Sequence, residues 1–336
     1  MTPRSSFRPK PSTLRKPLAA ARGDATRLAR LALADTAASS AHIVVTAVIV
    51  HWGSPDPTVR LVRELGERTG IDKVIVVAND LRARPFGLPD SAIWLVPPRN
   101  LGFAGGFDFG CRSCPGAECY LLLNNDVKID EACITECRHI LGDESIGIVA
   151  PVLVDSGGLQ SALGRVSLPL FKVTNRNYPG ADRVCDADWV SGAVMFVRAA
   201  CQEQVGFNLG YFLGFEDTDV CYRVRNSGWR VVVASHAEAW HQGGATIPDA
   251  GSAYYFTRNR IWFSRRWGSP LQACLVWLWI ATVLAPRALV GDLIKRRGAA
   301  RSLSVLHALV DGLKELPSEN AVAIGEPYPE KWSRWT

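Results

Sequence analysis

The sequence lacks the markers of several common protein classes. Residues 1–30 contain no apolar core of the kind that a secretory signal needs, so export by that route is not expected. No internal repeats are visible, and the apolar run at 273–285 has 13 residues. A membrane-spanning helix needs about 20 residues. Neither a repeat array nor an ordinary spanning helix is therefore predicted.

Two kinds of ligand motif are also missing. The nine cysteines include a CxxC at Cys111 and Cys114, but no second CxxC or histidine pair completes a tetrahedral zinc set. The GxxxxGK[ST] phosphate loop is absent, and no acid is placed for a dinucleotide fingerprint. Several cysteines lie in apolar runs, where a reduced thiol behaves as a small hydrophobic group. This use of cysteine indicates the cytoplasm.

Positive charge is concentrated at the start of the chain. Residues 1–30 carry eight basic residues and one acidic residue, whereas the net charge of the whole 336-residue chain is +6. Such a segment could bind nucleic acid or anionic lipid, or it could be a solvated, disordered tail. The tail is the favoured interpretation, and a nucleic-acid partner is not expected.

Apolar runs alternate with helical segments along residues 43–265. A continuous apolar run is typical of a strand that is covered on both faces, and the alternation favours a mostly parallel α/β sheet. Asp56-Pro57 and Asp130 mark two helix starts. Strands are predicted at 43–50, 73–78, 93–96, 119–123, 146–150 and 190–197, and helices at 56–65 and 130–141.

Residues 119–126 read CYLLLNND, an apolar run that stops at a polar triplet. In open α/β sheets ligands lie beyond the carboxyl ends of the strands. Asn124, Asn125 and Asp126 are therefore expected to face a ligand crevice, with a single carboxylate among them.

A glycine-rich segment, RNLGFAGGFDFG, occupies residues 99–110. Gly102, Gly105 and Gly106 allow tight turns, so the loop could present backbone N–H groups and a helix N-terminus to a phosphate. The alternative is a set of tight turns without a ligand.

Three acids, Glu216, Asp217 and Asp219, begin a predicted helix. Acids favour the first turn of a helix through its dipole, but a carboxyl whose pKa is raised by its neighbours could also act as a general base. His241, in AWHQGG, could be a structural residue or could reach a metal or a phosphate.

The segment after Trp267 is predicted to be helical. The run at 273–285 is apolar almost all round, Pro286 and Arg287 are expected to interrupt it, and a second helix places Leu303, Leu306, Val310 and Leu313 on one face. Flanking aromatic and basic residues suit an interfacial membrane anchor. A core-covering helical pair or a dimer interface is the alternative.

The ordered motifs resemble the inverting glycosyltransferases of family 2, and among them a rhamnosyltransferase-like branch. The resemblance covers about residues 45–265 and implies a GT-A fold with a nucleotide-binding half at 43–126 and an acceptor half at 127–265. The other predicted segments are a tail at 1–40, a helical segment at 266–316 and a tail at 317–336. The matching stretches are NLGFAGGFDFG (100–110), LLLNNDV (121–127), VSGAVMFVR (190–198), GFEDTDVCYR (214–223), His241 and YYFTRN (254–259).

The resemblance also implies roles for individual residues. Asp126 and His241 would hold Mg²⁺ or Mn²⁺ on the donor diphosphate, Asp217 would be the catalytic base, and Asn124 would lie beside the ribose. The remaining expected residues fall into two sets. Glu216, Asp219 and Trp240 support the acceptor site; Asn79, Asp80, Asn100, Gly102, Phe103, Gly105, Gly106, Asn125 and Gly192 join Asn124 in nucleotide-sugar binding.

The chain departs from the family at two positions. Ala78 replaces the acid that usually ends the second strand and reads the nucleobase, so Asn79 or Asp80 would have to substitute. Asn124 replaces the first acid of the DxD motif, which leaves one carboxylate for the cation. A hard cation that keeps waters and phosphate oxygens can still bind such a site.

The expected activity is transfer of a sugar, first of all L-rhamnose, from a dTDP- or UDP-linked donor. The acceptor would be a cell-surface glycan or a polyprenyl-diphosphate-linked sugar, and the enzyme would be cytoplasmic and peripheral on the membrane, with a homo-oligomer as an option. The alternatives are another hexosyl or galactofuranosyl transferase, a nucleotidyltransferase and a catalytically silent scaffold. A nucleotidyltransferase would need a basic glycine loop near 50–57, which the sequence lacks. A silent scaffold would leave the retained acids unexplained.

Overall fold

The computed structural model describes residues 43–243, 249–295 and 299–314. The tails predicted at 1–40 and 317–336 lie outside the described residues. By backbone contacts the chain divides between His42 and Ile43, and the description below concerns the second unit.

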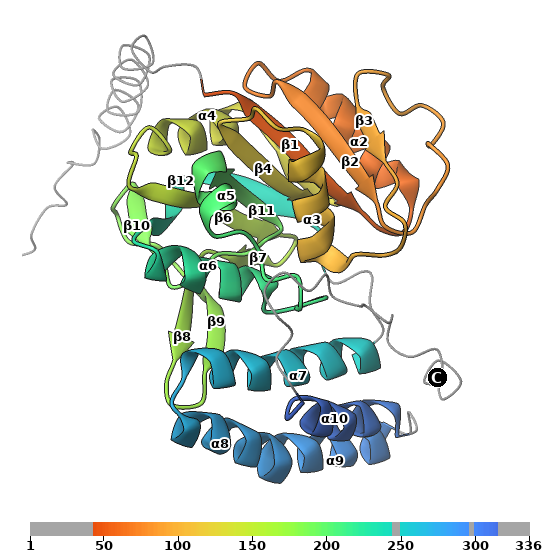
Figure 1. Cartoon of the computed structure of the whole chain (residues 1–336), viewed down its shortest axis with the longest axis vertical. Helices are drawn as coiled ribbons and strands as arrows, with labels where there is room; N and C mark the ends of the chain where they lie inside the picture. The colour runs from red at the N-terminus through yellow and green to blue at the C-terminus, as the bar shows by residue number, and fades with distance from the viewer. Residues whose placement is uncertain (1–42, 244–248, 296–298, 315–336) are drawn as a thin grey trace, which may run out of the picture. The chain divides into compact units, whose positions relative to one another are not determined.

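A ten-stranded sheet forms the centre of this unit (Figure 1). Its order is β10-β12-β6-β11-β4-β1-β2-β3, with β5 added to β12 and β7 added to β6. β11 is antiparallel to β4 and β6, whereas the pairs β1–β2, β1–β4, β2–β3 and β6–β12 are parallel. The strands are β1 (Val45–His51), β2 (Lys73–Ala78), β3 (Ile93–Leu95), β4 (Cys119–Asn124), β5 (Val127–Ile129), β6 (Ile146–Asp155), β7 (Gly158–Ser161), β10 (Val184–Asp186), β11 (Val194–Arg198) and β12 (Arg230–His241).

Helices cover both faces of this sheet. α2 (Pro55–Gly66) and α4 (Glu131–Ile140) pack on one face, and α3 (Gly102–Ser113), α5 (Ala199–Gln204) and α6 (Glu216–Asn226) pack on the other. All seven residues of β1 are buried, as its continuous apolar run predicts. The α/β prediction is therefore confirmed.

The helix starts agree with the sequence in one case and differ in the other. Asp130 is the N-cap of α4, and its carboxylate accepts a hydrogen bond from the Cys133 N–H at 2.8 Å. α2 begins at Pro55, one residue earlier than predicted, and Ser54 is its N-cap. A proline is compatible with the first turn of a helix, because its missing N–H has no partner there in any case.

Most of the glycine-rich segment, residues 102–110, lies in α3 and is therefore helix and not a loop. Gly105 and Gly106 lie inside the helix, and a Cβ at Gly106 would lie 3.0 Å from Val50 Cγ1. At Gly110 a Cβ would lie 2.5 Å from Val48 Cγ1. Gly106 and Gly110 therefore let α3 pack directly against β1. This packing is a further role for the glycines, besides the phosphate loop and the tight turns that the sequence suggested.

The C-terminal helices form a group beside the sheet (Figure 1). They are α7 (Asp249–Trp267), α8 (Pro270–Trp279), the π-helical segment η2 (Ile280–Leu284), α9 (Ala285–Lys295) and α10 (Ala300–Asp311). The hairpin of β8 (Leu163–Ser167) and β9 (Lys172–Asn177) reaches them, and its Phe171 packs on Phe263 at 5.8 Å between ring centroids. This contact joins a third hydrophobic core to the sheet domain.

The expected interruption at Pro286 is wrong. The helix continues from Pro270 to Lys295, because the turn before the proline widens to π geometry and the Ala285 N–H donates to Ile280 O. A wider turn accommodates a ring that would otherwise crowd the preceding carbonyls. The resulting helix has 26 residues and a mean hydropathy of 1.9, so its length and composition suffice to cross a membrane.

Much of the apolar surface of these helices faces outward. Leu289, Val290, Leu293 and Ile294 of α9 are 49–76% exposed. On α10 the predicted face also points outward, since Leu306, Val310 and Leu313 are exposed while Val305, Ala308 and Leu309 are buried. The face with Leu306, Val310 and Leu313 therefore does not pack on the core. A membrane anchor and a dimer interface stay as predictions for it.

Candidate active site

The polar triplet lies at the edge of the sheet where the strands end. Asn124 is the last residue of β4, and its N–H donates to Ala193 O at 3.0 Å. Asn125 turns toward β1, where its Nδ2 donates to Trp52 O and Thr58 Oγ1, both at 3.1 Å. Asp126 turns the other way, toward β12. The three neighbours therefore have three different surroundings.

Asp126 and His241 face each other across this edge. The distance from Asp126 Oδ1 to His241 Nε2 is 3.2 Å, and the Gly243 N–H donates to Asp126 Oδ2 at 3.1 Å. Burial alone would raise the pKa of Asp126, but the His241 and Gly243 contacts outweigh it and lower that pKa. The carboxylate is thus held in its charged form.

The His241 ring is oriented by Gln160 of β7. The Gln160 amide nitrogen donates to His241 O at 3.1 Å and to Asp155 Oδ2 at 3.4 Å, so its carbonyl oxygen faces His241 Nδ1 at 2.7 Å. Nδ1 then carries a proton, and Nε2 lies 3.1 Å from Asn124 Nδ2 and 3.2 Å from Asp126 Oδ1. Nε2 is therefore the ring nitrogen that faces the Asp126 carboxylate.

This pair fits a divalent cation that is shared with a ligand. A neutral imidazole whose other nitrogen is hydrogen-bonded is the form that binds metals, and a hard cation accepts one or two protein groups together with phosphate oxygens and water. No cluster of three or more His, Cys, Asp or Glu side chains suited to a metal occurs in the described part of the chain. The protein alone would thus supply two ligands, Asp126 and His241.

His51 and Asp80 form a second polar pair, at the ends of β1 and β2. His51 is fully buried, its Nδ1 lies 2.6 Å from Thr58 Oγ1, and its Nε2 lies 3.6 Å from Asp80 Oδ1. Burial lowers the pKa of His51, and the Asp80 charge partly opposes that effect. His51 was missed by sequence reasoning, although its place at a strand end was a signal for it.

Asn79 and Asp80 are the two candidates to replace the acid that Ala78 lacks. Asn79 holds the backbone at the start of α3. Its Nδ2 donates to Gly102 O at 2.9 Å, and its Oδ1 accepts from the Leu101 N–H at 3.2 Å. Asp80 accepts from the Gly53 N–H at 2.7 Å, beside the end of β1. Asp80 is thus the acid next to the strand ends.

The start of α3 joins the two halves of the domain. Gly102 has φ +69°, its N–H donates to Asn100 Oδ1 at 2.9 Å, and a Cβ there would overlap Phe212 O. The Phe103 N–H donates to that same Phe212 O at 3.2 Å. Glycine is required at 102 because of both its backbone conformation and this close approach.

Asp217 lies at the start of α6 and is held by several donors. Its Oδ1 accepts from the Thr218 N–H at 2.7 Å and from Thr218 Oγ1 at 3.3 Å, and its Oδ2 accepts from the Gly192 N–H at 3.3 Å. Burial raises the pKa of Asp217, and these hydrogen bonds partly oppose the rise. A carboxylate with a raised pKa and a fixed position is suited to accept a proton.

Glu216 has the opposite environment. It is buried, and its Oε2 has no hydrogen-bond partner in the described structure. Burial first, and then the charge of Asp217, raise the pKa of Glu216. Two adjacent carboxyls do not ionise together easily, so the protonated form falls to Glu216 and the charge to Asp217.

A strained turn holds α6 in place. Phe215 has φ +70°, which is uncommon for a bulky residue, and Gly214 before it has φ +75°. The fully buried Asn259 donates to Leu213 O at 2.8 Å and to Gly214 O at 2.7 Å. The YYFTRN stretch of α7 therefore fixes the loop that carries Glu216 and Asp217.

Asp219 and Trp240, the other residues expected to support the acceptor site, have contacts of their own. Asp219 is fully buried and accepts from Trp267 Nε1 at 2.7 Å, with Arg266 Nε at 3.7 Å, so it fastens α6 to α7. Trp240 contacts Lys128, whose Nζ lies 4.9 Å from the ring centroid. Successive side chains of a strand alternate between faces, so Trp240 and His241 point in opposite directions.

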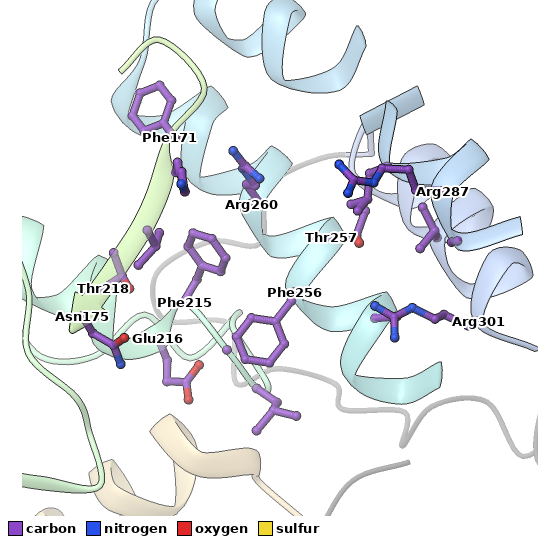
Figure 2. A pocket seen from close by; sticks show the side chains of 18 of the residues that line it. Phe171, Asn175, Phe215, Glu216, Thr218, Phe256, Thr257, Arg260, Arg287 and Arg301 are labelled. Carbon is purple, nitrogen blue, oxygen red and sulfur yellow. The ribbon is translucent and has the colours of Figure 1, made fainter. Parts of the chain in front are cut away.

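A cavity of about 850 Å³ opens beside Glu216 and Asp217. Figure 2 shows Glu216 and Thr218 along one wall, with Arg287 and Arg301 across from them and Phe256 between. The distant wall comes from α7, α9 and α10. Sequence reasoning missed Arg287 and Arg301 because they follow Asp217 by 70 and 84 positions and carry no pattern of their own.

Two adjacent backbone contacts connect the sheet edge that carries Asp126 and His241 to this cavity. Ala193 O accepts from the Asn124 N–H, and the preceding residue, Gly192, donates to Asp217. A Cβ at Gly192 would lie 2.8 Å from Phe103 Cε1 and 3.5 Å from Asp217 Cβ. The expected residues Asn124, Phe103, Gly192 and Asp217 are thus brought together in one site.

Comparison with solved structures shows the same fold. The crystal structure of GalNAc-T7 with UDP, GalNAc and Mn²⁺ is 12% identical with a TM-score of 0.53, and the match covers 67% of this chain and 48% of that one. This chain therefore spans about half the length of GalNAc-T7. The mannosyltransferase PcManGT from Pyrobaculum calidifontis, in complex with GDP-Man and Mn²⁺, is 12% identical with a TM-score of 0.50, covering 82% and 88%.

Comparison of sequences locates the family. No curated protein sequence matches the chain. Residues 45–264, nearly the whole α/β unit through α7, match the family described as glycosyltransferase-like family 2. The ordered motifs, the GT-A fold and this match agree, and the chain belongs to glycosyltransferase family 2.

Proposed function

We propose that the protein is an inverting glycosyltransferase that uses a nucleotide diphosphate sugar. A hydroxyl oxygen of the acceptor forms a bond to the anomeric carbon, the bond from that carbon to the phosphate oxygen breaks, and its electron pair leaves with the nucleotide diphosphate. Asp217 accepts the hydroxyl proton. Attack from the face opposite the leaving group inverts the anomeric configuration.

The observation that carries this proposal is the separation of two carboxylates by role. Asp126, with a lowered pKa, faces His241 at the sheet edge, whereas Asp217, with a raised pKa, lies in the cavity beyond Gly192. The first is suited to a cation and the second to a proton.

Asp126 and His241 would hold Mg²⁺ or Mn²⁺. When bound, the cation neutralises the charge that develops on the departing diphosphate. The chain's own residues hold and orient its ligands: Gln160 sets the ring of His241, and the Gly243 N–H sets the carboxylate of Asp126.

The donor is proposed from the comparisons and from the resemblance. The neighbours are bound to UDP and to GDP-Man, which supports a nucleotide sugar. We propose a dTDP- or UDP-linked donor, L-rhamnose first, as in the rhamnosyltransferase-like branch, and an acceptor in cell-surface glycan synthesis. The nucleotide would lie along the strand ends between Asp80 and Asn124, with its diphosphate beside the start of α3.

The outward apolar surface of α8, α9 and α10 supports attachment to a membrane from the cytoplasm. We propose that these helices hold the enzyme at the bilayer, with a homo-oligomer through the same surface as the competing outcome. Membrane fractionation of the full chain, before and after Leu293→Glu and Ile294→Glu, tests this assignment. Unchanged fractionation would contradict it.

A donor screen tests the proposed activity. Purified full-length protein should bind or hydrolyse one of a panel of nucleotide sugars in the presence of Mn²⁺ and should fail to do so in EDTA. NMR of the product formed with an acceptor should show the inverted anomer. A retained anomeric configuration, or no nucleotide sugar bound at all, would overturn the proposal.

A further inference from the structure

His51, the last residue of β1, is polar and fully buried, and the proposed transfer reaction gives it no role. We propose that His51 is a positioning residue, whose Nε2–H holds the carboxylate of Asp80 in the orientation that receives the nucleoside of the donor. The inference rests on the proposed function for the presence of a nucleotide donor. It goes further by naming the side chain that orients Asp80.

His51 lies where several segments of the donor end meet. Its backbone oxygen accepts from the Asn79 N–H at 3.2 Å, directly after β2. Its Nδ1 lies 2.6 Å from Thr58 Oγ1 in α2 and 3.4 Å from Nδ2 of Asn125, the residue after β4. Its Nε2 lies 3.6 Å from Asp80 Oδ1. One imidazole ring is thus next to polar groups from α2 and from the ends of β2 and β4.

The surroundings of the two ring nitrogens indicate where the proton lies. Burial lowers the pKa of His51, and a neutral imidazole has one N–H donor and one acceptor nitrogen. The Thr58 hydroxyl at Nδ1 can donate as well as accept, so it leaves either tautomer open. The Asp80 carboxylate at Nε2 can only accept, and it would repel a lone pair there. The proton therefore lies on Nε2, directed at Asp80.

The Nε2 of His51 is a buried donor whose hydrogen bond is incomplete. It has no hydrogen-bond partner among the described residues. Its distance of 3.6 Å from Asp80 Oδ1 is longer than the about 2.7–3.2 Å of an N–H···O hydrogen bond. A buried donor without a partner is unfavourable, so a small movement of Asp80 toward the ring is favoured.

The Asp80 carboxylate lies between two donors. The Gly53 N–H donates to its Oδ2 at 2.7 Å, and His51 faces its Oδ1. A carboxylate offers about four acceptor sites, so one donor at each oxygen fixes the plane of the group and leaves further sites free. The Asp80 side chain is 26% exposed, so free sites reach the surface at the strand ends. An N–H or O–H of a nucleoside is suited to them.

The neighbouring strand leaves room for the ring. His51 pairs with Ala78 in the register of β1 and β2, and paired residues of adjacent strands carry their side chains on the same face. The Trp94 ring lies nearby, with 5.8 Å between the ring centroids. A longer side chain at position 78 would compete with the imidazole for this space. The alanine at 78, the histidine at 51 and the acid at 80 thus form one arrangement.

The competing interpretation is a core histidine that only ties β1 to α2 through Thr58. Both interpretations use Nδ1, and only the positioning role uses Nε2. Substitutions that keep one nitrogen at a time therefore separate the two. The amide of an asparagine at position 51 reaches the place of Nδ1, whereas the longer amide of a glutamine reaches the place of Nε2 and can donate to Asp80.

Calorimetry of the full-length protein in Mn²⁺ tests the role. UDP, dTDP and GDP are compared on the wild type, and the tightest of them is then titrated into His51→Asn, His51→Gln and the exposed control His139→Asn. Inorganic diphosphate is the probe without a nucleoside. We expect His51→Asn to bind the nucleotide about tenfold more weakly, the loss of one hydrogen bond, with inorganic diphosphate unchanged. His51→Gln and the control should stay close to the wild type for both probes.

Three results would overturn the positioning role. They are an unchanged nucleotide affinity in His51→Asn, an equal loss in the asparagine and glutamine variants, and a parallel loss of inorganic diphosphate binding. The second would assign His51 to packing alone. If the wild type binds none of the nucleotides, the proposed function fails and the inference fails with it. Circular dichroism spectra and melting temperatures establish which variants are folded.

Nitrogen-15 NMR of the histidine rings tests the same assignment on the wild type. Long-range ¹H–¹⁵N spectra should show His51 with its proton on Nε2, and its signals are identified by their absence from the spectrum of His51→Gln. The nucleotide, added with Mg²⁺ in place of the paramagnetic Mn²⁺, should shift the Nε2 signal as the contact with Asp80 shortens. A proton on Nδ1, or an Nε2 signal that does not respond to the nucleotide, would overturn the proposal.

Discussion

The two ends of the proposed site, the sheet edge around Asp126 for the donor and the cavity beside Asp217 for the acceptor, are built in different ways. At the donor end Asn124, Asn125, Asp126 and His241 satisfy one another and their neighbours through hydrogen bonds at strand ends. At the acceptor end a cavity lies between α6 and helices that occur much later in the chain, and Arg260, Arg287 and Lys295 line it without an ion pair to a carboxylate among the described residues. The first is a closed polar network, and the second is an open, charged surface.

Because of this difference, we expect the donor end to be similar among members of the family and the acceptor end to vary from one member to another. A network at the sheet edge depends on strand register, so its geometry is inherited with the fold. The wall of α9 and α10 can change its side chains without disturbing the sheet. We therefore expect donor recognition to vary little within the family, and we propose that the C-terminal helices select the acceptor.

The largest effect should come from Asp217→Asn. Removing the proton acceptor should lower the rate of transfer by about 10³-fold or more, while affinity for the sugar nucleotide stays the same. Transfer rates and donor binding are measured in parallel, and the exposed Asp90→Asn serves as the control. Near-normal turnover of the Asp217 variant would remove this residue from the chemistry.

Asp126→Asn should act on the donor end instead. The change removes the only carboxylate of the metal pair, and Mn²⁺ affinity in the presence of the nucleotide should fall by roughly 100-fold. Electron paramagnetic resonance of Mn²⁺ titrations measures the loss, and Asp90→Asn serves again as the control. An unchanged Mn²⁺ affinity would remove Asp126 from the cation site.

Gln160→Leu should have a smaller effect on the same end. Without the amide oxygen, the Nδ1–H of His241 loses its acceptor, so the ring is free to turn or change tautomer. We expect Mn²⁺ affinity to fall by about tenfold, whereas Gln160→Glu, which keeps an acceptor, should stay close to the wild type. Equal affinities of the two variants would exclude a positioning role.

The smallest effect concerns the pH dependence of stability. The pKa of Glu216 is raised on folding, so its contribution is present below the unfolded pKa of 4.5 and is lost as pH rises through the folded value. Glu216→Gln cannot ionise. Its free energy of unfolding relative to the wild type should therefore increase by about 1 kcal/mol or more above that range.

Denaturant unfolding at several pH values measures this difference, with the exposed Glu144→Gln as control. Asp126 should behave in the opposite sense, because its lowered pKa stabilises the fold at neutral pH and loses that contribution as pH falls. A pH-independent effect of Glu216→Gln would show that this carboxyl is not protonated in the folded protein.

Much of the donor end could be predicted because its signals are local. The run at 119–123 followed by Asn124-Asn125-Asp126 combines burial with a polar stop, and β4 ends there. Asp130 was recognised as a cap because its side chain acts on a residue three positions later. Such features depend on nearby residues and on the period of a strand or a helix.

Other assignments failed because the sequence does not say what packs against what. Asp219 and Asp217 are two positions apart in one helix, yet one faces Trp267 and the other faces the cavity. The glycine-rich segment resembles a phosphate loop, but Gly106 and Gly110 lie in α3 and let it pack on β1. Nucleotide-sugar binding by Gly105 and Gly106 stays a prediction. Pro286 suggested a break, and a π turn upstream absorbed it.

The sequence by itself determined the α/β class, the order of the motifs and the identity of the carboxylates, because periodicity and composition are properties of the chain. Only the tertiary structure decided which carboxyl meets His241, which meets Gly192 and which has a buried oxygen with no hydrogen-bond partner among the described residues. It also placed Arg260, Arg287 and Lys295 around the same cavity as Asp217. Charge, burial and hydrogen bonding depend on neighbours in space, and for this site those neighbours are far apart along the chain.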